Sequence, residues 1–213
     1  MKRKPSALVV VAVAAAVSFP AAAHATFAPR VTVNIDPATP HARPAIETTV
    51  TEAAGDTPPK RFTLSFPRGF TLKHPSGVET CAASKRRSGR CSRASEIGSV
   101  AAVLPTGERL RGTVNLARRG KQREIAVLLR GKAGMPQLGF VGYSKVSPLG
   151  ASQLTLDQLP NVPLSSLTVR LTGGTRGMVT TPKVCGASMV QGLLTSQLGE
   201  LAVGLSPVQI AGC

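Results

Sequence analysis

Four cysteines, Cys81, Cys91, Cys185 and Cys213, carry the clearest chemistry in this 213-residue sequence. An even number of cysteines predicts disulfides where a chain is exported, as the N-terminal segment described below indicates, and four cysteines allow three pairings. We favour Cys81–Cys91, which closes a short loop, and Cys185–Cys213, which ties the last residue to the body of the domain. The alternative is a metal site. It is disfavoured because spacings of ten and 28 residues, with no histidine beside a cysteine, fit no zinc pattern.

A run of positive charges overlaps the first cysteine pair. Residues 85–93 read Lys-Arg-Arg-Ser-Gly-Arg-Cys-Ser-Arg, with five cations and no large apolar side chain. Guanidinium groups suit bidentate contacts with phosphates and carboxylates, so the run predicts an exposed loop that binds anions. The alternative is a set of solvated turns in a basic chain. Further basic turns at 118–121 and 130–132 would extend the patch, whose candidate residues are Lys85, Arg86, Arg87, Arg90 and Arg93.

Residues that could catalyse a reaction are sparse. Beyond the N-terminal segment the histidines are His41 and His74, and no Gly-x-Ser-x-Gly elbow occurs. The ten acidic residues form no privileged pair, and we interpret Glu79 and Glu96 as partners of the nearby cations. The three aspartates are isolated from one another, which disfavours a calcium loop. We therefore expect no catalytic residues, no cofactor and no metal.

The N-terminus has the three parts of a secretory signal. Lys2, Arg3 and Lys4 precede an uncharged apolar stretch at 7–19, and Ala-His-Ala follows at 23–25. We expect cleavage after Ala25, and a retained anchor is the alternative. No later stretch is apolar and long enough to span a bilayer. Cleavage removes three of the 26 basic residues and none of the ten acidic ones, which leaves a net charge of +13.

The remainder of the chain alternates apolar and polar residues with period two, which is typical of strands buried on one face. Glycine and proline turns separate these runs, and no segment shows helical spacing with caps. The pattern predicts residues 26–213 as a single all-β domain, an antiparallel two-sheet sandwich of Ig-like or Greek-key type with about ten short strands. A closed barrel is the alternative. The apolar runs include 31–35, 62–66, 110–116, 125–129, 154–156, 167–171 and 201–205, the last comprising Leu201, Val203 and Leu205.

The order of short motifs resembles a secreted β-module that recurs, often in tandem, in exported proteins of high-GC Gram-positive bacteria. The matching pieces, besides the cysteines, are Phe66–Gly69, Ser95–Gly98, Leu159–Leu164, Gly173-Gly174, Pro182–Gly186 and Gly212-Cys213. This chain departs from the pattern at Ser92, where a proline often follows the second cysteine. The resemblance implies an extracellular β-domain and supports the cysteine pairing. It brings no catalytic residues.

These observations predict a secreted or cell-envelope-associated, non-enzymatic adhesion or structural protein. Its basic loops would be attracted to anionic envelope polymers or to a phospholipid surface, without sequence-specific binding of nucleic acid. One alternative is an envelope hydrolase or carbohydrate-active enzyme, which a deep pocket lined by acids or a histidine would favour. Another is a domain that binds a partner protein, which an exposed apolar patch would favour. The oligomeric state stays open.

Overall fold

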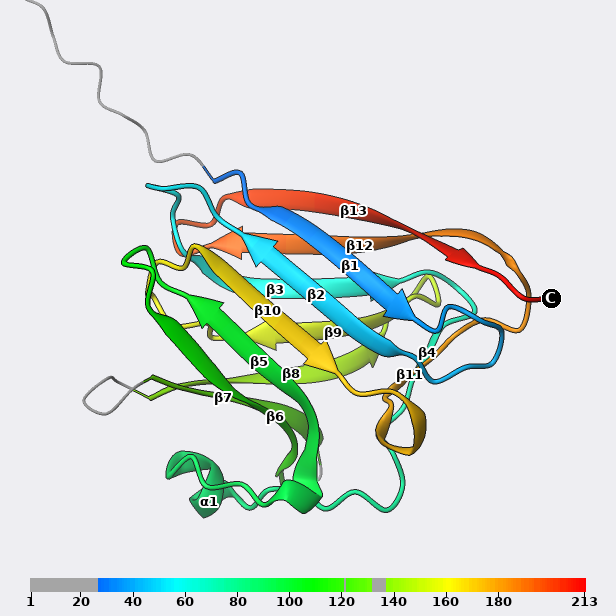
Figure 1. Cartoon of the computed structure of the whole chain (residues 1–213), viewed down its shortest axis with the longest axis horizontal. Coiled ribbons are helices and arrows are strands. Elements are labelled where there is room, and N and C mark those ends of the chain that lie inside the picture. Colours follow the sequence, from blue (N-terminus) through cyan, green and yellow to red (C-terminus); the bar gives the residue numbers. More distant parts are fainter. Residues whose placement is uncertain (1–26, 121, 132–136) are drawn as a thin grey trace, which may run out of the picture.

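The computed structural model describes residues 27–120, 122–131 and 137–213, so the expected signal peptide lies outside the described residues. Almost all regular structure is β-strand (Figure 1). The strands are β1 Arg30–Asp36, β2 Ala45–Thr51, β3 Pro59–Phe66, β4 Thr71–Leu72, β5 Glu96–Val103, β6 Arg109–Arg119, β7 Gln122–Arg130, β8 Leu138–Val146, β9 Ser152–Asp157, β10 Ser166–Leu171, β11 Val179–Thr180, β12 Gly186–Ser196 and β13 Leu201–Ile210. The predicted all-β class is confirmed.

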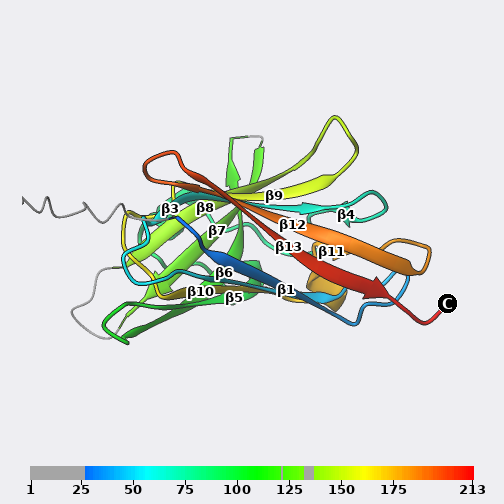
Figure 2. The ribbon, with the colours of Figure 1, turned by 90° about the horizontal axis from the view of Figure 1, so that it is seen from above.

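Eleven of these strands form one antiparallel sheet in the order β1-β2-β10-β5-β6-β7-β8-β9-β3-β12-β13, and β4 pairs with β11 separately. The sheet curls back on itself, so that β1, β2, β10 and β5 cross over β8, β9, β3 and β12 (Figures 1 and 2). A single, nearly closed sheet replaces the two separate sheets of the predicted sandwich. It is closer to the closed alternative, because the long strands β6 and β7 continue the strand pairing round one side, with a single register shift between β5 and β6 at Glu96–Gly98.

The core lies between the two curled halves. Side chains on the inner face of each strand are buried as the period-two pattern predicts, including Ile46, Leu64, Val127, Leu156 and Leu171. Burying such apolar side chains is the main favourable contribution to folding. Residues Gly186–Ser196 form the long strand β12.

The two ends of the sheet meet along a seam between β1 and β13. Val33 donates a backbone hydrogen bond to Ser206 Oγ at 3.1 Å, and Ala211 donates one to the Ala38 carbonyl at 2.9 Å. These contacts show that the two strands run in the same direction, without the continuous ladder of the other pairs. The seam therefore depends largely on side-chain packing.

Helices are short. α1 covers Ala83–Arg87, and single 3₁₀ turns, η1 and η2, occur at Arg93–Ser95 and Gly174–Arg176. Within the described ranges, no helix is long and apolar enough to cross a bilayer.

Candidate functional site

The basic run between the first two cysteines lies on the outer surface of the sheet (Figure 1). The structure joins Cys81 to Cys91 and Cys185 to Cys213, which is the pairing that the sequence favours. Disulfides are typical of proteins in oxidising compartments. The 81–91 bridge ties the run to β6, because the Cys81 amide donates to the Leu116 carbonyl at 2.7 Å. The run was expected to be a loop, but its first part is the one-turn helix α1.

One cation of the run, Arg86, forms an ion pair within the folded protein. Arg86 Nη1 lies 2.9 Å from Glu124 Oε2, and Glu124 is only 5% exposed. Glu124 shares the outer face of β7 with Leu128, which is 6% exposed although it points away from the core. Leu128 lines hollows on both sides of the disulfide-linked segment, so this segment covers it. Arg86 therefore fastens the segment to the sheet and is a poor candidate for binding an external anion.

The other four cations of the run are exposed: Lys85, Arg87, Arg90 and Arg93. None of them forms an ion pair with a carboxylate of the described residues. Arg93 lines a hollow of about 310 Å³ together with Arg130 of β7. Arg111 of β6 lies directly opposite Arg130 in the strand register, and both are exposed. We define the basic face as Lys85, Arg87, Arg90, Arg93, Arg111 and Arg130.

Sequence reasoning assigned Glu79 and Glu96 as ion partners of the run, and the structure pairs them differently. Ser92 Oγ donates to Glu79 Oε2 at 3.3 Å, and Glu96 lines the Arg93 hollow without forming an ion pair among the described residues. The partner that was missed, Glu124, lies 38 residues from Arg86. Its signal in the sequence is a carboxylate on the strand face that also carries the apolar residues Ala126 and Leu128.

His74 lies in a second hollow, of about 380 Å³, with Glu79, Arg118 and Arg123. Its Nδ1 atom is buried and has no hydrogen-bond partner among the described residues. Burial lowers the pKa of His74, and the positive charge of Arg123 lowers it further. A catalytic histidine needs a nucleophile and an orienting group within hydrogen-bond reach. The other histidine, His41, is exposed and lies outside this hollow.

No group of three or more His, Cys, Asp or Glu side chains in residues 27–120, 122–131 and 137–213 is arranged to hold a metal ion.

A surface that sequence reasoning missed lies on the β12–β13 hairpin. The alternation in β13 predicts that Leu201, Val203 and Leu205 are buried, and this is wrong: they are 67%, 57% and 59% exposed. Smaller residues occupy the inward positions between them, among them Gly204. A Cβ atom at Gly204 would lie 2.7 Å from Val31 Cβ on β1, so only glycine fits. A slip of one residue would drive a large side chain into Val31, and the seam thus fixes the register that exposes the large residues.

The same face of β12 adds further apolar side chains. Leu193 lies opposite Val203, and Met189 opposite Pro207. Leu198, in the hairpin turn, is 76% exposed. We define the apolar face as Met189, Leu193, Leu201, Val203, Leu205 and Pro207. Exposed apolar residues that occur singly are ordinary, whereas a contiguous group indicates an interaction surface.

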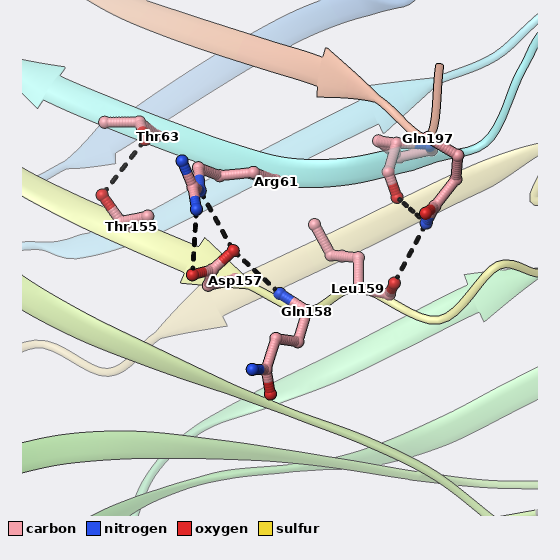
Figure 3. A network of polar contacts seen from close by, with 8 residues as sticks. Arg61, Thr63, Thr155, Asp157, Gln158, Leu159 and Gln197 are labelled. Atoms are coloured by element: carbon pink, nitrogen blue, oxygen red, sulfur yellow. Dashed lines mark hydrogen bonds and ion pairs between the residues drawn. The ribbon is translucent and has the colours of Figure 1, made fainter. Parts of the chain in front are cut away.

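Polar pairs bound this face on the neighbouring strands. Across β3 and β9, Arg61 donates to both oxygens of Asp157 at 3.0 and 3.2 Å, and the Thr63 and Thr155 hydroxyls lie 3.1 Å apart (Figure 3). The hydrogen bonds from Arg61 lower the pKa of Asp157. At the hairpin turn, Gln197 donates to the Leu159 carbonyl at 3.2 Å. The outer surface therefore changes from paired polar groups on β3 to mainly aliphatic side chains on β12 and β13, among which Gln191, opposite Leu205, is an exposed polar residue.

Comparisons with known proteins add little. No protein-family model matches the chain, and no curated protein matches it. A crystal structure of BslA, a bacterial hydrophobin, aligns over 86% of this chain and 94% of its own, at 15% sequence identity and a TM-score of 0.27. A likeness of that size carries no argument about this protein.

Proposed function

We propose that this protein is a non-enzymatic, secreted or envelope-associated module that binds anionic polymers through its basic face. The observation that carries the proposal is the group of exposed cations, without carboxylate partners in the described structure, on a segment held by a disulfide and by the Arg86–Glu124 pair. Because the segment is held in place before binding, little conformational entropy is lost when a polymer docks. Arg93 and Arg130 line the same hollow, and their two positive charges outnumber the one carboxylate there, Glu96, which favours the binding of a phosphate or carboxylate group.

Two features support the proposed location outside the cell or at its envelope. The paired cysteines suit an oxidising environment, and the expected signal peptide would direct export. The net charge of +16 for the full chain attracts polyanions at long range, but it gives no selectivity. Selectivity must come from the arrangement of the cations on the basic face, so the experiment has to separate the effect of their position from that of total charge.

The experiment measures binding of the oxidised protein to a poly(glycerol phosphate) polymer and to DNA at low and physiological salt. It compares a variant that loses three cations of the basic face, R87S/R90S/R93S, with a control that loses three exposed arginines elsewhere, R30S/R43S/R170S. Both carry the same net charge. We expect the first to lose at least about tenfold in affinity for the wall-type polymer and to show a smaller salt dependence, since fewer counterions are released. Equal losses in both variants would show that the binding reflects composition, and the proposal would be wrong.

A further inference from the structure

The apolar face is separate from the basic face and needs its own explanation. β13 lies at one side of the molecule, and α1, which carries part of the basic face, lies at the other (Figure 1). Between residues 186 and 210 the only charged side chain is Glu200, which accepts a hydrogen bond from Ser196 Oγ at 2.9 Å. The aliphatic side chains of the face thus contact water, which is unfavourable, and Glu200 is the one charged residue that the hairpin sequence places near them.

A second copy of the chain is a poor occupant for this face. Positions 189–195 of β12 pair with 201–207 of β13. Seven residues at about 3.3 Å each, across two strands about 4.8 Å apart, give a narrow face with a projected area of roughly 220 Å², which side-chain relief increases only in part. A stable protein interface buries about 800 Å² on each partner. In addition, two copies with a formal charge of +16 each repel one another.

The interior of a lipid bilayer is fluid, so a small apolar face can enter it without a large complementary surface. Where the lipid headgroups are negatively charged, they attract this positively charged protein. We propose that the apolar face docks onto an anionic phospholipid bilayer, with its side chains entering the boundary between headgroups and acyl chains. Exposed lysines lie near both ends of β12: Lys183 precedes the strand, and Lys60 follows Pro59, which pairs with Ser196. They are placed to contact lipid phosphates at the rim of the face.

Tryptophan fluorescence provides a direct test, because the chain contains no tryptophan. Single variants place one indole on the apolar face (L201W), on the outer surface of β5 (A101W) or on α1 (S84W); all three native residues are exposed. Each oxidised variant is mixed with phosphatidylglycerol–phosphatidylcholine vesicles at physiological salt, with and without lipids brominated along the acyl chain. We expect a blue shift and bromine quenching for L201W alone. Quenching of A101W or S84W in place of L201W would overturn the proposal.

Substitutions on the face supply the second readout. The L201T/V203T/L205T variant keeps side chains that suit a strand but removes aliphatic surface, and we expect vesicle partitioning to fall at least about tenfold. An unchanged partition coefficient would contradict the proposal. So would a doubling of the wild-type mass in sedimentation without lipid that is lost in this variant, because the face would then dock a second copy.

The outcome is distinguishable from that of the proposed function. Introducing R87S/R90S/R93S into L201W removes cations of the basic face and leaves the apolar face intact. We expect the fraction of bound protein that is quenched by brominated acyl chains to be unchanged, even where weaker charge attraction lowers total binding. Conversely, L201T/V203T/L205T retains binding to the poly(glycerol phosphate) polymer. Loss of quenching in the first variant would show that lipid contact depends on the basic face, contrary to the inference.

Discussion

Replacing Arg86 with leucine tests whether this arginine belongs to the fold and its neighbour Arg87 to the binding surface. Removing one member of a buried ion pair costs about 3–5 kcal/mol, because the other charge stays buried without its partner. The Arg86 side chain is 23% exposed and that of Glu124 is 7% exposed, so water offsets part of the loss, and we expect about 2–3 kcal/mol. With a urea dependence of about 2 kcal/mol per molar, the unfolding midpoint falls by about 1–1.5 M.

The assay is equilibrium unfolding of the oxidised protein in urea, with R87L as the matched control. Both substitutions change the same residue type within α1, so helix propensity and net charge cancel between them. We expect R87L to leave the midpoint nearly unchanged and to weaken polymer binding. Adding E124L to R86L should recover most of the stability, because an apolar pair can replace a buried ion pair at little cost. Equal midpoints for R86L and R87L would refute the assignment of Arg86 to the fold.

Two further predictions concern the seam and the pH dependence of stability. The G204A variant should lose about 1–3 kcal/mol in the same urea assay, because its methyl group meets Val31, and the loss should shrink when V31A is present; an equal loss in both backgrounds would contradict this packing. Burial raises the pKa of Glu52 to about 7 from its ordinary 4.5, so the free energy of unfolding should decrease as pH rises from about 4.5 to 7. Since Glu52 is only partly buried, E52Q should be more stable than the wild type by about 1–2 kcal/mol at pH 8 and nearly equal at pH 4.5; a constant difference across this range would count against it.

The sequence predicts the strands well because the residues on the inner face of each strand are apolar and recur at every second position. Runs such as Phe62–Phe66 and Leu167–Leu171 alternate in phase with the core, and glycine and proline turns separate them. The closure of the sheet could not be predicted in this way. Whether strands divide into two sheets or continue as one depends on which strands pair, and the period-two pattern of a single strand contains no information on its neighbours.

The two candidate surfaces also differ in how far the sequence predicts them. The basic face was predictable in part, because Arg87, Arg90 and Arg93 are close in sequence and the turn that begins at Arg130 was expected to extend the patch. Arg111, by contrast, joins them only through the pairing of β6 with β7. The apolar face was misread, since large residues at 201, 203 and 205 predict burial of that side. The opposite side is buried because Val31, from the far end of the chain, occupies the space beside Gly204. A contact between residues so distant in sequence leaves no local signal except the glycine itself.

The seam between β1 and β13 also bears on the order of folding. Val33 and Ser206, which it joins, are 173 residues apart, so the entropy of closing that loop is lost before any seam contact stabilises the chain. Hairpins such as β6–β7 and β12–β13 form from neighbouring residues and are free of this cost. We therefore expect the seam to form late in assembly and to be the place where the native sheet opens at least cost, since few backbone hydrogen bonds cross it. Exchange of the Val33 and Ala211 amide hydrogens, which are bonded across the seam, would register such opening long before the rest of the sheet lost its protection.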